Sequence, residues 1–148
     1  MTALYRAVLV GIALFLVAGP AAALDYRSLA EPTVMYDAPS IKAKPLYVIA
    51  RATPVEVVVA LDGWLKVRDA SGSLAWVEER VVTDQRTVLV NVARAQIRSQ
   101  PQADAPIVFE AGKNVVLTLL ELAPSGWAKV QHRDGQTGYV RADQVWGL

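Results

Sequence analysis

The chain has 148 residues, 53% of them hydrophobic, with 15 Lys and Arg residues against 14 Asp and Glu residues and no Cys. This composition excludes an intrinsically disordered chain, which needs low hydrophobicity and a high net charge. It also excludes a disulfide scaffold, which needs Cys, and an electrostatic nucleic-acid binder, which needs a marked basic excess. The length fits one ordinary domain or two very small ones.

The first 23 residues have the layout of a secretory signal peptide. A short basic start is followed by the apolar run Ala7–Gly19, and Pro20 then precedes three alanines. Small residues at Ala21 and Ala23 fit the pockets of a signal peptidase, so we expect cleavage after Ala23. The alternative is an uncleaved anchor, because residues 7–24 carry no charge and reach the lower length limit for a membrane span. With cleavage, we expect a periplasmic or secreted protein.

Removal of this segment changes the charge balance of the chain. Arg6 is the only charged side chain in residues 1–23, so 14 basic and 14 acidic residues remain. A net charge of zero argues against a nucleic-acid partner. A membrane contact is expected only if the N-terminal segment stays uncleaved. Because the exported chain has no Cys, its fold must be held by its own apolar core.

After residue 23 the chain contains two copies of one unit. Gly63–Val67 reads Gly-Trp-Leu-Lys-Val, and Gly126–Val130 reads Gly-Trp-Ala-Lys-Val, 63 positions later. Other landmarks repeat at nearly the same spacing: Gly72 with Gly135, Trp76-Val77 with Tyr139-Val140, Val34 with Ile97, and Pro39 with Pro101. The last pair is 62 positions apart, which predicts an extra residue in the loop of the first copy. We interpret the pattern as an internal duplication, with domains over residues 24–84 and 85–148.

Each copy is predicted to consist of short strands separated by tight turns. β-Branched or alternating runs predict strands at Val55–Leu61, Trp64–Arg68 and Ser73–Val77 in the first copy, and at Thr87–Val92, Val115–Leu120, Trp127–Gln131 and Thr137–Val140 in the second. Asp134-Gly135 supplies the positive φ values of a tight hairpin. No segment after residue 23 shows a long helical period, so the expected fold class is all-β.

Five or so short strands in each unit predict a small barrel, because closure protects strand edges. A domain of roughly 60 residues is marginally stable alone. The junction at Thr83–Arg86 is too short for a flexible linker. We therefore expect two tandem small β-barrels that pack against each other.

The landmarks of both copies follow one order: an apolar strand with a short loop, a Trp-x-Lys-Val strand, a Gly turn and an aromatic-Val strand. They are Val34–Ser40, Trp64–Val67, Gly72 and Trp76-Val77 in the first copy, and Ile97–Pro101, Trp127–Val130, Gly135 and Tyr139-Val140 in the second. In this order the chain resembles the bacterial SH3-like (Src-homology-3) domains of exported proteins. The resemblance implies tandem SH3-like barrels that bind rather than catalyse, with cell-wall peptides or protein segments as ligands.

The reactive side chains do not form a familiar catalytic set. His132 is the only His and Cys is absent, so a Cys-His pair and a His/Cys zinc site cannot form within one chain. We expect His132 to be a solvated side chain beside a hairpin turn. Glu78 and Glu79 are adjacent on a strand and point to opposite faces, which makes a poor acid/base pair, and Asp62 and Asp69 only flank one strand. The expected protein is not an enzyme and has no metal or cofactor.

Alternation along the two Trp strands separates a core face from an outer face. Leu65 and Val67 share one face, so Trp64 lies on the other, and Trp127 has the same place in the second copy. Peptides and sugars can stack on such aromatic surfaces, whereas the alternative is that each Trp packs under its own loop as scaffold. The candidate ligand-binding residues are Tyr36, Asp37, Pro39, Trp64, Trp76, Arg98, Trp127 and Tyr139.

The first copy is expected to carry more of the binding. Its loop contains Tyr36 and Pro39, whereas the second loop has Ser99 and Gln100 and no aromatic side chain. For Asp37 the alternative is a turn residue that bonds its own backbone. We expect an exported protein that binds a peptidoglycan peptide or a protein segment. An accessory or regulatory partner of an envelope enzyme and a purely structural interaction module stay open.

Overall fold

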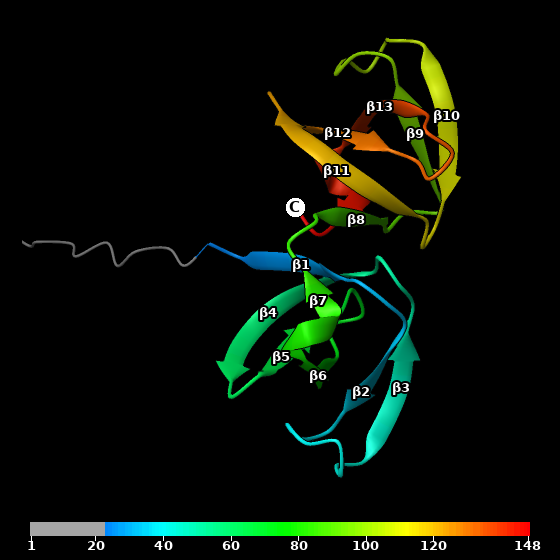
Figure 1. Ribbon diagram of the computed structural model, residues 1–148. Coiled ribbons are helices and arrows are strands. Elements are labelled where there is room, and N and C mark those ends of the chain that lie inside the picture. The colour runs from blue at the N-terminus through cyan, green and yellow to red at the C-terminus, as the bar shows by residue number, and fades with distance from the viewer. Residues whose placement is uncertain (1–22) are drawn as a thin grey trace, which may run out of the picture.

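The computed structural model describes residues 23–148, which form two consecutive antiparallel β-sheets (Figure 1). The predicted signal peptide and its alternative, a membrane anchor, fall on the segment up to residue 22 and so lie outside the described residues. In the described part of the chain no helix is long and apolar enough to cross a membrane. The predicted all-β class and the tandem arrangement are confirmed.

The first sheet has seven strands in the order β3-β2-β6-β5-β4-β1-β7. They are β1 (Asp25–Leu29), β2 (Thr33–Tyr36), β3 (Pro45–Ile49), β4 (Pro54–Leu61), β5 (Trp64–Arg68), β6 (Leu74–Glu78) and β7 (Val82–Thr83), with the short 3-10 helix η1 (Glu79–Val81) between the last two.

The second sheet repeats this topology in the order β10-β9-β13-β12-β11-β8-β14. Its elements are β8 (Thr87–Val90), β9 (Arg94–Arg98), β10 (Ile107–Gly112), β11 (Val116–Ala123), β12 (Trp127–Gln131), β13 (Thr137–Arg141), η2 (Ala142–Gln144) and β14 (Val145–Trp146). The identical strand order confirms the internal repeat at the level of topology.

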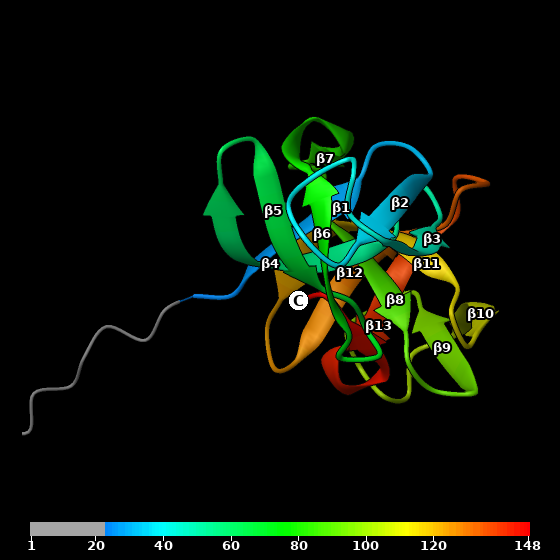
Figure 2. The same ribbon diagram turned by 90° about the horizontal axis from the view of Figure 1, so that it is seen from below.

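Each sheet bends around its own apolar core. In the first domain β4 pairs with β1 over residues 54–57 and with β5 over residues 56–61, and a bulge lies between Val57 and Val59. A bulge bends and twists a strand, which lets one strand serve both sides of the barrel (Figures 1 and 2). The core side chains are Leu29, Met35, Ile49, Val55, Leu65, Val67, Ala75, Val77 and Val81, with a matching aliphatic set in the second domain.

Several strands were not foreseen from the sequence. β3 and β10 lie at the open edges of the two sheets, where side chains such as Leu46 and Val48 are exposed and no clear alternation of polar and apolar residues develops. An edge strand is paired on one side only, so its sequence is less constrained by burial. The two-residue strands β7 and β14 are too short to produce a pattern at all.

The first strand of the repeat is aligned differently from the prediction. Met35, and not Val34, occupies the position of Ile97: Met35 and Ile97 are fully buried, whereas Val34 is exposed on the opposite face. The cross-strand pairs agree, because Tyr36 and Arg98 stand opposite Trp76 and Tyr139, respectively. A slip of one residue reverses every side chain, so this correction decides which residues face outward.

The predicted extra residue in the first copy is wrong, because the loops that hold Pro39 and Pro101, residues 37–44 and 99–106, are equally long. The extra residue lies in the second copy, in a later turn. β4 and β5 are joined by the two-residue turn Asp62-Gly63, whereas β11 and β12 are joined by the three residues Pro124–Gly126. Both residues of the shorter turn have positive φ, as the tightest hairpins require. At the predicted Asp134-Gly135 hairpin only Gly135 has a positive φ, of 94°.

The two domains pack end to end, with β1 and β8 near the junction (Figure 1). The buried hydroxyl of Thr87 donates a hydrogen bond to the carbonyl of Ala52 across the junction at 2.7 Å. The rings of Tyr26 and Trp146 meet edge to face, with centroids 5.2 Å apart. These contacts confirm the expectation that the domains pack against each other.

Candidate functional site

Three aromatic side chains and one Lys form the aromatic face of the first domain, which we define as Tyr36, Trp64, Lys66 and Trp76. They come from β2, β5 and β6, which are neighbours in the sheet. Tyr36 and Trp64 meet edge to face at 5.7 Å, and Trp76 is the cross-strand partner of both Tyr36 and Lys66. The Lys66 ammonium lies 6.0 Å from the centre of the Trp76 ring. All four side chains are half-buried, so part of each of the three aromatic rings faces solvent.

Strand geometry produces this arrangement. Leu65 and Val67 point into the core, so Trp64 and Lys66 point outward, as the alternation predicted. Aromatic rings on neighbouring strands are held by the sheet and lose little freedom when a ligand stacks on them. The arrangement is suited to an extended segment with flat or apolar groups and one anionic group.

Asp37 and Pro39 lie in the loop that follows β2. The carboxylate of Asp37 accepts a hydrogen bond from the backbone N–H of Lys44 at 3.0 Å, and the two residues also share a backbone hydrogen bond. Asp37 therefore bonds the backbone of its own loop, as expected for a turn residue. Its partner, Lys44, lies at the far end of that loop. Pro39 is half-buried in the same loop. Both residues closely follow Tyr36 of the aromatic face in the chain.

The corresponding face of the second domain differs. Trp127 is only 9% exposed, so little of its ring is open to a ligand. The Arg98 guanidinium takes the position of Tyr36 and donates hydrogen bonds to the carbonyl of Ala105 at 2.7 Å and to the side chain of Gln96 at 2.6 Å. Tyr139 remains half-buried, with the Lys129 ammonium 6.0 Å from its ring centre.

Two shallow cavities flank Trp127. One, of about 210 Å³, is lined by Arg98, Arg141 and other polar residues, and the second, of about 320 Å³, lies over the turn before β12. The structure thus places Arg98 and Trp127 together and Tyr36, Trp64 and Trp76 together, in separate domains. Among the described residues, neither of these cavities unites the candidate residues of both domains.

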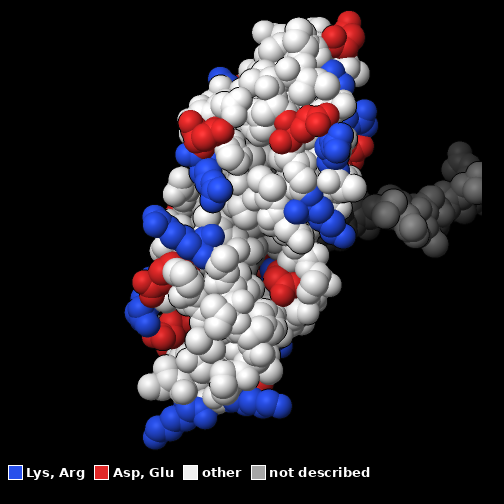
Figure 3. Space-filling model, turned by 90° about the vertical axis from the view of Figure 1, so that its right-hand side faces the viewer, with Lys and Arg blue, Asp and Glu red and all other residues white. Residues whose placement is uncertain are grey.

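The charged side chains near these faces differ in their surroundings. Arg68 forms an ion pair with the largely buried carboxylate of Glu56 at 2.8 Å. Arg133 lies in the hairpin between β12 and β13 and lines a cavity between the domains. On the side of the molecule seen in Figure 3, basic and acidic side chains are interspersed. This distribution agrees with the nearly balanced charge of the chain.

Tyr47 and Asp69 form a polar contact that the sequence did not reveal. The Tyr47 hydroxyl donates a hydrogen bond to Asp69 at 3.0 Å, and the same carboxylate accepts the backbone N–H groups of Ser71 and Ser73. Burial, followed by the hydrogen bond to Asp69, raises the pKa of Tyr47 to about 12. The contact ties the edge strand β3 to the turn between β5 and β6.

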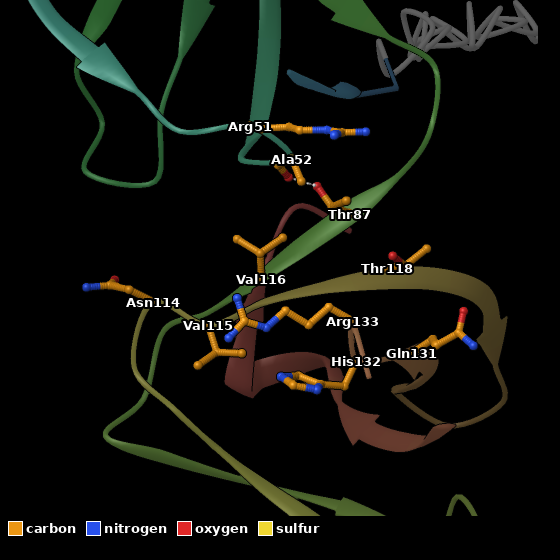
Figure 4. Close-up of a pocket in the computed structure, with 10 residues that line it drawn as sticks. All are labelled: Arg51, Ala52, Thr87, Asn114, Val115, Val116, Thr118, Gln131, His132 and Arg133. Carbon is orange, nitrogen blue, oxygen red and sulfur yellow. Dashed lines mark hydrogen bonds between the residues drawn. The ribbon is translucent and has the colours of Figure 1, made fainter. Parts of the chain in front are cut away.

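His132 is not the fully solvated side chain that we expected. Only 26% of the side chain is exposed, and its Nδ1 lies 3.0 Å from a carboxylate oxygen of Asp134. The ring of Phe109 packs 5.7 Å away. Hydrogen bonds from Gln136, first from its backbone, lower the pKa of Asp134 to about 2. His132 lines the cavity between the domains together with Arg51 (Figure 4).

Other candidate reactive groups are dispersed. The carboxylate of Glu78 binds Arg80 at 2.9 Å, and Glu79 begins η1. Among residues 23–148 no group of three or more His, Asp or Glu side chains is placed to hold a metal ion.

Comparison with known proteins assigns a family to both domains. Residues 30–84 match a family model described as a bacterial SH3 domain, and residues 93–145 match a second model with the same description. No match was found among curated proteins.

Among solved structures, the chain is similar to NlpC1 and NlpC2 from Trichomonas vaginalis and to an NlpC/P60 family protein from Bacillus cereus. Sequence identities are 18%, 18% and 16%, with TM-scores of 0.38, 0.39 and 0.39. The matches cover 85%, 85% and 84% of this chain and 46%, 49% and 56% of the other chains, respectively. The chain therefore spans about half the length of the solved structures that it matches.

Proposed function

The chain belongs to the bacterial SH3 family and carries two of its domains in tandem, and from this we propose that it is an exported, non-enzymatic binding protein. Its ligand is a peptide of the cell envelope, either a peptidoglycan stem peptide or a segment of an envelope protein. The aromatic face of the first domain provides the binding surface.

The contact between Tyr36 and Trp64 carries this proposal. The two rings stand at 83° to each other and both are partly open to solvent. Rings at this angle offer an edge and a face to one ligand, and the nearby Trp76 extends the surface across the sheet. Lys66 adds a positive charge that suits a carboxylate on the ligand.

The second domain does not duplicate the binding site of the first. Trp127 is buried, and Arg98 uses its guanidinium to hold its own loop. An arginine with its donors already bonded to the protein has fewer left for a ligand. The ligand is therefore assigned to the first domain.

Export is proposed from the sequence of residues 1–23 alone. The intact mass of protein recovered from the periplasm should correspond to a chain that begins at Leu24. A full-length mass in the membrane fraction would support the uncleaved anchor instead.

Binding is tested with purified sacculi and, in parallel, by affinity capture from envelope extract. Tyr36→Ala should weaken binding by about 2 kcal/mol, roughly thirtyfold, as expected for a central aromatic anchor. Tyr139→Ala is a matched control, because it truncates an outward-facing aromatic side chain in the second domain. Far-UV circular dichroism should show that both variants are folded.

The outcomes separate the ligand types. Sedimentation with sacculi indicates the peptidoglycan peptide, whereas capture of a single polypeptide without sedimentation indicates an envelope protein and an accessory role. If folded Tyr36→Ala binds with unchanged affinity while Trp127→Phe weakens binding, the assignment to the first domain is wrong.

A further inference from the structure

A second site lies between the two domains, away from the aromatic face. A cavity of about 430 Å³ is bounded by the loop between β3 and β4 in the first domain, and by the start of β11 and the hairpin between β12 and β13 in the second. Figure 4 shows Arg51 on one side of this space and Arg133 with His132 on the other. Its volume is within the range of small-molecule sites, roughly 300–1,000 Å³.

The cavity has a positive charge that the protein does not neutralise. Every other Arg in residues 23–148 forms an ion pair or donates a side-chain hydrogen bond, whereas Arg51 and Arg133 do neither within that range. No Asp or Glu is among the lining residues. Asp134 contacts the lining residue His132, but its carboxylate is already engaged by His132 and Gln136.

The remaining lining residues restrict the kind of anion. Val115 and Val116 provide an aliphatic wall, and Asn114 and Thr118 provide uncharged polar groups. Neither of these polar side chains forms a hydrogen bond with another of the described residues. A ligand that fits this cavity has a compact anionic group for the two guanidinium groups. It also has a small aliphatic group for the valine wall and a hydrogen-bonding group for Asn114 and Thr118.

The walls of the cavity are held in place by the domain junction. Thr87 is 3% exposed, and its hydroxyl donates a hydrogen bond at 2.7 Å to the carbonyl of Ala52, the neighbour of Arg51 in the chain. Ala52 and Asn114 occupy equivalent loops in the two repeats, and both have a positive φ, 67° and 69°. The same loop of each repeat therefore turns into one cavity.

We propose that this cavity binds the free terminal carboxylate of a short peptide, with Arg51 and Arg133 contacting the carboxylate from opposite domains. Guanidinium groups bind carboxylates by strong charge-assisted hydrogen bonds. The aliphatic wall contacts a small side chain near the peptide terminus. This site does not depend on the aromatic face or on the ligand proposed for it.

The proposal is tested by NMR titration of the ¹⁵N-labelled protein with acetyl-alanyl-alanine as the free acid, as the C-terminal amide, and in parallel with inorganic phosphate. The free acid should shift the backbone amide signals of Asn114, Val115, Val116 and Arg133 at millimolar concentration. The amide should bind about tenfold more weakly, because it lacks the charge that the guanidinium groups recognise.

Arg51→Gln and Arg133→Gln should each weaken binding of the free acid about tenfold. Arg80→Gln is the matched control, because it also removes one exposed charge but lies outside the cavity. Tyr36→Ala should leave the titration unchanged, so failure at the aromatic face is distinguished from failure here. Equal binding of acid and amide, equal binding of phosphate and acid, or no shift in these signals would each overturn the proposal.

Discussion

At the scale of single residues, the difference between Tyr36 and Arg98 changes the outer face of the repeat. Both stand at the same strand position, opposite Trp76 and Tyr139. Tyr36 contacts Trp64 edge to face and leaves it half-exposed, whereas Arg98 is bonded to the loop of its own domain, where Trp127 is buried. An aromatic ring offers surface for stacking, but a guanidinium with satisfied donors mainly holds structure.

The pKa of Tyr47 provides a residue-scale prediction. Its phenol should ionise near pH 12, against about 10 for an exposed tyrosine, because burial and the hydrogen bond to Asp69 favour the neutral form. A raised pKa in the folded state gives stabilisation that is fully present below pH 10 and is lost as the pH rises toward 12. Ultraviolet difference spectroscopy against pH measures the ionisation.

Two variants identify the tyrosine that is responsible. Tyr47→Phe should remove the high-pH step from the titration and leave the other steps in place. Asp69→Asn should move the step toward lower pH, because the hydrogen bond and the negative charge that favour the neutral phenol are both weakened. An unchanged titration for Tyr47→Phe would show that the phenol of Tyr47 is not the perturbed group.

At the scale of elements, the two barrels use the same strands but fill one core position differently. Gly138 on β13 faces Ile97, and a Cβ added there would lie 2.5 Å from a methyl carbon of Ile97. The first domain has Ala75 at the equivalent place, with Met35 as its neighbour in the core. A flexible Met leaves space for an added methyl group, whereas a β-branched Ile does not.

This exchange of volume between the paired strands can be tested. Gly138→Ala should destabilise the second domain by about 1–3 kcal/mol through overpacking. Ile97→Met combined with Gly138→Ala reproduces the pair of the first domain and should recover most of this loss. Urea unfolding of the single and double variants gives the free energies, and their double-mutant cycle gives the coupling between the two positions.

The Ile97→Met variant alone is the control for this cycle. A conservative swap of this kind usually costs less than about 1.5 kcal/mol. The double variant could instead be no more stable than Gly138→Ala. The added Cβ would then clash mainly with the carbonyl oxygen of Arg98, 2.8 Å away, and not with the Ile97 side chain.

At the scale of the whole molecule, the junction turns two marginal domains into one unit and creates the cavity between them. Tyr26 and Trp146 contact each other across it, and the Arg86 guanidinium lies 5.6 Å from the centre of the Tyr26 ring. Arg86 also donates a hydrogen bond to the carbonyl of Gly147 at 2.8 Å. Trp146 and Gly147 are therefore built into the junction.

Gly147→Ala should weaken the junction. The residue has a φ of 112°, and an added Cβ would lie 2.9 Å from the carbonyl of Thr87 and 3.2 Å from Pro54 of the first domain. We expect the substitution to lower the free energy of unfolding by more than the roughly 1–2 kcal/mol that backbone strain alone would cost. Thermal unfolding should then show two transitions in place of one, because the domains no longer support each other.

Gly135→Ala is the matched control for this variant. Its φ of 94° imposes a similar backbone strain, but nothing lies within 4 Å of the added Cβ. It should lower stability by about 1–2 kcal/mol without separating the two domains. Equal effects of the two substitutions would mean that contact across the junction contributes nothing measurable.

The sequence by itself determined the all-β class, the repeat and the outward side of the Trp strands. These follow from alternation and turn residues, which act locally: the pattern around Trp64 predicted the side on which each of its neighbours lies. The order of the landmarks also led to the correct family.

The tertiary structure decided what depends on distant residues. Met35, and not Val34, aligns with Ile97. The alignment is set by the register of cross-strand pairing, which the sequence of a single strand does not reveal. The burial of Trp127 depends on residues that are remote in sequence. Arg51 and Arg133 meet at one cavity only because two domains pack in one orientation, and local sequence patterns carry no information on that orientation.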